Sequence, residues 1–221
     1  MTRLNKTQIA VLVALSAVAL VLVARVGLKA LTGKQATVSL KSKGPSEAGL
    51  KIVEYIDFEC PACSQGVRLL NEYFQKYPDK IYLEVKYYPL ESHRHAYLSA
   101  RYVECSLRQD KFWPFLDLLM AQQRQWAVLT DPQPAFHQYA QTAGMNIAQM
   151  EGCLKDKAMP DVIFSEKAEG VGMGVRSTPT YFINGEMVVG PKVLKEKLAA
   201  YFGETVQASL PAPPPQTPVR P

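Results

Sequence analysis

The chain has 221 residues, of which 48% are hydrophobic and 20% charged, a composition that supports a packed domain and excludes disorder throughout. Its 25 basic and 20 acidic side chains give a formal net charge of +5 at pH 7. The excess lies in residues 1–34, which hold basic but no acidic side chains: Arg3, Lys6, Arg25, Lys29 and Lys34. Residues 35–221 are therefore neutral overall, which argues against nucleic acid as a partner.

An apolar segment occupies the N-terminal end of the chain. From Ile9 to Ala24 only Ser16 is polar, and as a helix this run spans about 24 Å of a hydrocarbon core about 30 Å thick. We predict a transmembrane anchor over residues 1–31. The alternative is a cleaved signal peptide, but the Ala-Val-Ala triplet at 17–19 lies inside the apolar run, whereas a cleavage site follows it.

The next segments predict a β-α-β unit. Residues 32–48 are polar and rich in Gly, Ser and Lys, as expected for a linker. Leu50–Ile56 is typical of a strand, the spacing of apolar residues becomes helical over Pro61–Lys76, and residues 81–88 alternate as a second strand. The sequence Cys-Pro-Ala-Cys at 60–63 falls at the strand-to-helix turn.

The remainder of the chain is first helical and then mixed. Helical patterns dominate residues 93–170, in segments at 96–107, 112–125, 135–143 and 147–170, the last interrupted near Pro160. Strands at Thr180–Ile183 and Glu186–Val189 flank an Asn-Gly hairpin turn, and a helix begins at Pro191. Residues 203–221 form a proline-rich tail. We therefore predict an α/β domain over 49–202 with a helical insertion.

The cysteine pair at 60 and 63 predicts thiol-disulfide exchange. Cys60 lies at the cap of the helix, where free N–H groups and the helix dipole stabilise a thiolate. Pro61 suits the first helical position because its missing N–H would be unpaired there. An exposed Cys60 exchanges with substrate, and a recessed Cys63 resolves the mixed disulfide. The alternatives are an inert disulfide and half of a zinc site, which lacks a second close ligand pair.

Two motifs together carry a family resemblance. Phe-Glu-Cys-Pro-Ala-Cys at 58–63 and Arg-Ser-Thr-Pro-Thr-Tyr-Phe-Ile-Asn-Gly at 176–185 resemble those of the DsbA-like thiol-disulfide oxidoreductases of thioredoxin fold. The resemblance covers residues 49–202. It implies a thioredoxin-like fold with a helical insertion, and a cis Pro179 that faces the redox pair. It also implies that the backbone of Thr178 pairs with an incoming peptide as an added strand.

Glu54 is a further candidate for the site, because the family often has a buried acid at this position. Strand alternation places Glu54 on the same face as Ile52 and Ile56, which favours burial. A buried carboxyl has a raised pKa and can relay protons for Cys63. The alternative is a solvent-facing glutamate.

Ala62 departs from the family pattern, in which oxidases commonly carry histidine here. Alanine removes a donor and a positive charge near Cys60, while Asp57 and Glu59 add negative charge. Both changes are expected to raise the pKa of Cys60 relative to a histidine version. A less stable thiolate makes a less oxidising disulfide, so we predict an oxidant of moderate strength.

The other two cysteines, Cys105 and Cys153, lie in the helical region. Many DsbA-like sequences carry such a second pair, and a bridge would close a loop of about 49 residues, worth about 4 kcal/mol in the chain-entropy model. The alternative is two separate buried thiols. A structural bridge implies an oxidising compartment, and hence a domain on the outer, periplasmic side of a bacterial cytoplasmic membrane.

These features predict an enzyme of the cell envelope that introduces disulfides into exported proteins, its partners being unfolded or reduced clients and the membrane. The resemblance implies a quinone-linked reoxidase of the DsbB or vitamin K epoxide reductase type. We expect a monomer without metal or cofactor. The alternatives are a reductase or isomerase of the same fold, and a thioredoxin-like chaperone or metal-delivery module. His93 and His95 are interpreted as solvated polar residues.

Overall fold

The computed structural model describes residues 41–205. The predicted anchor at 1–31, most of the predicted linker and the end of the tail, 206–221, lie outside the described residues. Within residues 41–205, no helix combines the length and the apolar character needed to cross a membrane.

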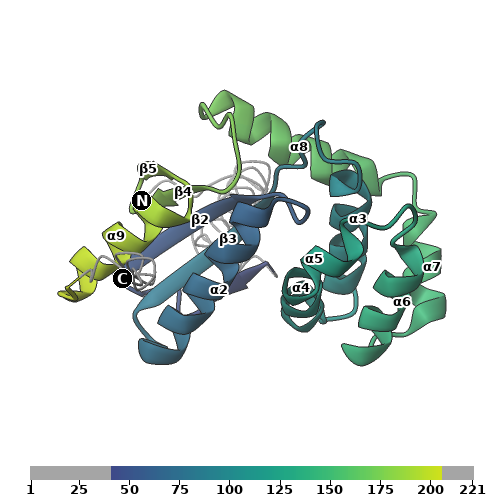
Figure 1. The fold of residues 1–221 in the computed structure, drawn as a ribbon, viewed down its shortest axis with the longest axis horizontal. Helices are drawn as coiled ribbons and strands as arrows, with labels where there is room; N and C mark the ends of the chain where they lie inside the picture. Colours follow the sequence, from purple (N-terminus) through teal and green to yellow (C-terminus); the bar gives the residue numbers. More distant parts are fainter. Residues whose placement is uncertain (1–40, 206–221) are drawn as a thin grey trace, which may run out of the picture. The chain divides into compact units, whose positions relative to one another are not determined.

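A five-stranded mixed sheet forms the centre of the domain, in the order β1-β3-β2-β4-β5 (Figure 1). Its strands are β1 (Ser42–Lys43), β2 (Leu50–Ile56), β3 (Ile81–Tyr87), β4 (Thr180–Ile183) and β5 (Glu186–Val189). β2 and β3 are parallel and joined by α2 (Pro61–Lys76), and the remaining pairs are antiparallel. At the β4–β5 hairpin, Asn184 and Gly185 both have positive φ, as a tight two-residue turn requires.

The two faces of β2 are covered by different helices. On one face Ile52 and Ile56 join the main core beneath α2, which packs in turn on α9 (Pro191–Phe202). On the other face Tyr55 packs with Tyr88 in a smaller cluster, under α8 (Met159–Gly172). From Glu54 to Ile56 the central strand is thus buried on both sides, and the Glu54 side chain is enclosed.

The predicted helical insertion is a block of helices that Figure 1 shows beside the sheet. Its further helices are α3 (Ala96–Leu107), α4 (Phe112–Ala121), α5 (Gln123–Trp126), α6 (Gln133–Thr142) and α7 (Ile147–Leu154). Phe115, Trp126 and Phe136 are fully buried between them, and α8 contacts both β3 and α3. The sequence predicted one helix over 112–125, whereas α4 ends at Ala121 and α5 begins two residues later.

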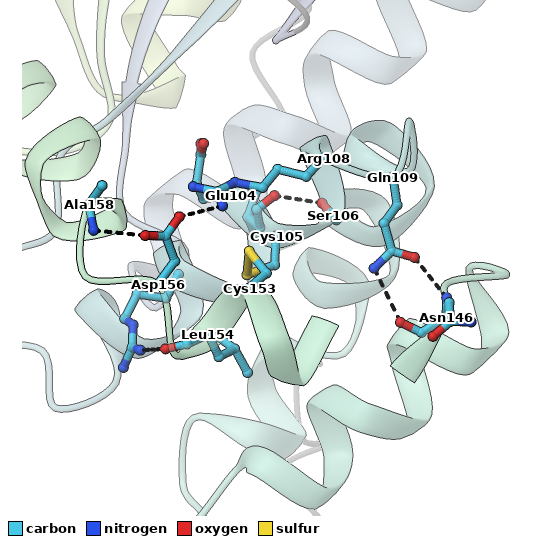
Figure 2. The surroundings of a disulfide bond; sticks show 12 residues. Glu104, Cys105, Ser106, Arg108, Gln109, Asn146, Cys153, Leu154, Asp156 and Ala158 are labelled. Atoms are coloured by element: carbon cyan, nitrogen blue, oxygen red, sulfur yellow. Dashed lines mark hydrogen bonds and ion pairs between the residues drawn. A yellow bond between two sulfur atoms is a disulfide. The ribbon is translucent and has the colours of Figure 1, made fainter. Parts of the chain in front are cut away.

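A disulfide between Cys105 and Cys153 joins α3 to α7, as the resemblance implied (Figure 2). Polar contacts flank it on both sides. Arg108 donates to Asp156 at 2.6 Å, and the Gln109 side chain exchanges hydrogen bonds with the backbone of Asn146. The bridge therefore lies within a set of contacts that already hold these two helices together.

Residues just outside both predicted edges of the domain, 49–202, make contacts with it. The predicted linker, 32–48, includes β1, which pairs with β3 and whose Ser42 carbonyl accepts a hydrogen bond from Trp113. A two-residue polar strand has no apolar alternation to reveal it. At the other end, the predicted tail includes Glu204, which accepts hydrogen bonds from Tyr73, Lys76 and Tyr77 of the α2 region.

Candidate active site

The cysteine pair lies at the start of α2, as predicted. Cys60 is the N-cap residue in an extended conformation, with Pro61 at the first helical positions. The Cys60 carbonyl accepts from the backbone N–H groups of Cys63 and Ser64 at 3.0 and 3.3 Å. Both cysteines are free thiols. The prediction of an exposed Cys60 is wrong, because this residue is only 7% exposed and its Sγ faces the Thr178 carbonyl oxygen at 3.4 Å.

The environment of the two thiols shifts their pKa values in opposite directions. A hydrogen bond from Cys63 lowers the pKa of Cys60 to about 5. Burial raises this pKa, but the backbone N–H groups of Ala62 and Cys63 lower it further. Burial raises the pKa of Cys63 well above its ordinary value, and the neighbouring Cys60 and Glu54 raise it further. At neutral pH the pair is therefore a thiolate at Cys60 beside a protonated thiol at Cys63.

The peptide bond between Thr178 and Pro179 is cis, as the resemblance implied. This segment covers the Cys60 sulfur through the Thr178 carbonyl. The Thr178 hydroxyl is buried and has no hydrogen-bond partner among residues 41–205. The turn is closed by the Thr180 hydroxyl, which donates to the Ser177 carbonyl at 2.7 Å. The second motif thus meets the first at the redox sulfur.

Glu54 is buried beneath α2, at 1% exposure, so the alternative of a solvent-facing side chain is wrong. Burial raises the pKa of its carboxyl to about 8, and the neighbouring Tyr181 side chain opposes this rise. Tyr181 lies directly opposite Glu54 in the β2–β4 ladder. A Cβ at position 66 would lie 1.9 Å from the Tyr181 hydroxyl, so Gly66 makes room for this pair. Sequence reasoning missed Tyr181, which the cross-strand register reveals.

Asp57 and Glu59, the two acids before the cysteine pair, accept hydrogen bonds from the loop that follows β3. The Asp57 carboxylate accepts from the backbone of Glu59 at 2.8 Å and of Leu90 at 2.9 Å. It also contacts His93 Nδ1 at 2.7 Å. Burial lowers the pKa of His93, but the contact with Asp57 outweighs this and leaves that pKa raised. Asp57 therefore holds the strand-to-helix turn against the loop at 90–95.

The interpretation of both histidines as solvated is wrong for His95. This residue is 5% exposed, and its Nε2 hydrogen bonds to the Leu129 carbonyl at 2.8 Å. Its backbone N–H donates to the Glu59 carboxylate. The flanking Arg94 had favoured a polar surface segment, but burial here depends on the α5–α6 loop, which is distant in sequence.

The helical block also reaches the redox turn. Gln123 of α5 is buried, and its Nε2 donates to the carbonyl oxygens of Phe58 and Cys60 at 2.7 and 2.9 Å. The Ser64 hydroxyl donates to the Met120 carbonyl at 3.1 Å. No local pattern marks Gln123, because its partners are more than sixty residues away in the sequence. Within residues 41–205, no cluster of His, Cys, Asp and Glu side chains is arranged to hold a metal ion.

Fold and site together define a thioredoxin-fold protein with a helical insertion and a dithiol at its redox turn. A family model described as thioredoxin matches residues 40–200. The chain therefore belongs to the thioredoxin family, and within it resembles the DsbA-like thiol-disulfide oxidoreductases, as its motifs predicted.

Solved structures support this assignment of the fold. The alpha-DsbA1 protein of Wolbachia pipientis superposes with a TM-score of 0.64 at 21% identity, over 74% of this chain and 89% of that one. A periplasmic thioredoxin-like protein from Salmonella enterica serovar Typhimurium gives 0.58 at 26% identity, over 74% and 93%.

Curated relatives of similar sequence carry another name. The Na⁺/H⁺ antiporter NhaA of Herminiimonas arsenicoxydans is 29% identical over 170 residues, which cover 77% of this chain and 25% of that protein. NhaA 3 of Salinispora tropica is 30% identical, with 76% and 25% covered. The chain thus spans about a quarter of the length of these relatives, and their name describes much longer proteins.

Proposed function

We propose that this protein is a thiol-disulfide oxidoreductase that introduces disulfides into exported proteins. The observation that carries the proposal is the contrast between its two thiols. A lowered pKa of about 5 makes Cys60 a thiolate at neutral pH, while Cys63 stays protonated because burial raises its pKa. An ionised outer cysteine and a protonated inner one are what dithiol-disulfide exchange requires.

The exchange proceeds in two balanced steps. A substrate thiolate attacks the Cys60 sulfur of the Cys60–Cys63 disulfide, which forms a mixed disulfide and releases Cys63 as a thiolate. Cys63 then takes a proton from the Glu54 carboxyl. A second substrate thiolate attacks the substrate sulfur of the mixed disulfide, so that the substrate disulfide forms and Cys60 leaves as a thiolate. Two electrons pass from the substrate dithiol to the protein pair.

The stability of the Cys60 thiolate supports the oxidising direction. The pKa of about 5 lies between about 7 in thioredoxin and about 3.5 in DsbA. A stabilised thiolate favours the reduced form of the protein, which makes its disulfide a better oxidant. We therefore propose an oxidant of intermediate strength, which Ala62 also favours.

The cellular setting is part of the proposal. The Cys105–Cys153 bridge suits an oxidising compartment, and residues 1–31 would anchor the domain to the outer side of a bacterial cytoplasmic membrane. Reduced exported proteins would be the clients, and a quinone-linked membrane oxidase of the DsbB or vitamin K epoxide reductase type would accept the electrons from Cys60 and Cys63.

The reduction potential of the pair, with an oxidative refolding assay, tests the proposal. We expect a potential clearly above the value of about −270 mV of thioredoxin, and reactivation of a reduced client that needs disulfides. Cys60→Ala should abolish the reactivation. Cys63→Ala, given oxidised glutathione as the oxidant, should accumulate a mixed disulfide at Cys60 that it cannot resolve. A potential near that of thioredoxin would favour the reductase alternative, and the absence of exchange would favour the chaperone or metal-delivery module.

A further inference from the structure

A narrow cavity connects the buried Glu54 with the seam between α2 and α4. Its walls are mostly apolar and come from α2, β3 and α4, and include Leu70, Val85 and Leu116. The acidic and amide side chains that line it are Glu54, Asn71 and Asp117. The centre of a water molecule has about 10 Å³ of room there, which is enough for about one water.

An open depression shares two lining side chains with this cavity. The depression, of about 410 Å³, is lined by Lys43 and Gln75 and again by Asn71 and Asp117. The same two side chains therefore border both spaces. Asn71 Nδ2 donates to Asp117 Oδ1 at 2.9 Å, and Lys43 Nζ donates to Asn71 Oδ1 at 3.4 Å. A hydrogen-bonded polar pair thus stands between the interior and the surface.

The other side of Glu54 is closed. Cys63 is fully buried, Cys60 is 7% exposed, and the Tyr181 hydroxyl fills the space beside Gly66. A proton on Glu54 therefore has no direct access to solvent on the side of the redox turn. After Glu54 has given its proton to Cys63, its raised pKa makes the carboxylate take up a second proton from solvent. Glu54 must release this proton again before it can accept the proton of Cys63, so a separate connection with solvent is needed.

We propose that Glu54 exchanges its proton with solvent through this cavity, past the Asn71–Asp117 pair, and not through the redox face. The inference rests on the proposed function, in which Glu54 serves Cys63. When the dithiol form is reoxidised, Glu54 first releases its proton outward. It then accepts the proton of Cys63, whose sulfur attacks Cys60 in the mixed disulfide and expels the partner as a thiolate. Asn71 and Asp117 are positioning residues, since neither touches a reacting sulfur.

The test uses oxidised glutathione as the probe. Mixing it with the reduced protein forms a mixed disulfide at Cys60, and rapid quench with mass spectrometry follows its resolution by Cys63. The double variant Asn71→Leu/Asp117→Leu closes the cavity with apolar groups. We expect the resolution rate at pH 7 to fall at least fivefold, with the Cys60 pKa and the reduction potential of the pair unchanged. The matched control is Gln75→Leu, which changes an exposed side chain that borders only the depression and should leave the rate unchanged.

The variant Glu54→Gln distinguishes the role of Glu54 in serving Cys63 from the route by which Glu54 exchanges its proton with solvent. If it slows resolution but the double variant does not, the proposed route is wrong while the role of Glu54 stands. If it leaves resolution unchanged, Glu54 does not serve Cys63. A double variant that shifts the Cys60 pKa or the potential as well as the rate would also overturn the route, because Asn71 and Asp117 would then act on the equilibrium. A wild-type protein that forms no mixed disulfide contradicts the proposed function itself.

Discussion

The redox turn and the helical block differ in how their contacts relate to the sequence. At the turn, the chemistry comes from residues three apart at the start of one helix, and a local pattern predicts it. The block acts on the same turn through Gln123, whose carbonyl partner in Phe58 is 65 residues away. A short motif therefore supplies the reactive groups, whereas the block determines how they are held and covered.

The largest expected effect comes from removing the disulfide of the helical block, which should change the stability of the protein but not its redox chemistry. Replacing both Cys105 and Cys153 by Ala removes a bridge that closes a long loop, and should lower the free energy of unfolding by about 4 kcal/mol. Urea denaturation measures this loss. The reduction potential of the Cys60–Cys63 pair should stay unchanged, because the bridge joins α3 to α7. A clear shift of that potential would mean that the block also controls the chemistry.

The second prediction concerns Glu54, a buried acid of the sheet. Its pKa is raised from 4.5 to about 8, so the folded protein keeps a proton that the unfolded chain loses. Its contribution to stability is therefore present below pH 4.5 and is lost as the pH rises toward 8. Relative to Glu54→Gln, the wild type should lose about 3 kcal/mol of unfolding free energy between pH 4 and pH 7.

Urea denaturation at the two pH values measures this difference. The control is Glu72→Gln, which changes an exposed carboxylate on α2 and should show no comparable pH dependence. Parallel curves for wild type and Glu54→Gln would contradict the raised pKa of Glu54.

The contrast between local and long-range contacts also explains which parts of the fold and of the site the sequence predicts. Strands β2, β4 and β5 and helices α2 and α3 have the predicted bounds, because their apolar periodicity and caps are local. The burial of Glu54 also followed from alternation. Strand β1 and the burial of His95 were missed, since each depends on partners distant in the sequence. The Asn71–Asp117 pair requires the packing of α4 on α2, which no local spacing encodes.

The third prediction tests the contact between block and turn directly. Gln123→Ala removes the donor to two buried carbonyl oxygens, those of Phe58 and Cys60. The Cys60 oxygen keeps the backbone N–H groups of Cys63 and Ser64, so the Phe58 oxygen is the one left unsatisfied. Unsatisfied buried groups of this kind cost about 1–3 kcal/mol, so we expect a loss of about 2 kcal/mol in unfolding free energy. Gln125→Ala, at an exposed position of the same short helix, should be near neutral. Equal effects of the two variants would show that the block does not stabilise the turn.

The smallest expected effect concerns position 62, and tests whether the redox turn alone sets the reduction potential of the Cys60–Cys63 pair. Ala62→His adds a donor and a positive charge beside Cys60, where the backbone N–H of residue 62 already favours the thiolate. The Cys60 pKa should fall by about one unit, worth about 1.4 kcal/mol, and the reduction potential should rise by about 30 mV. Thiolate absorbance and a glutathione titration measure these values, and Ala62→Gln controls for size without charge. If Ala62→His changes neither value, the hydrogen bond from Cys63 and the helix N–H groups determine the stability of the thiolate, and the side chain at position 62 does not set the reduction potential of the pair.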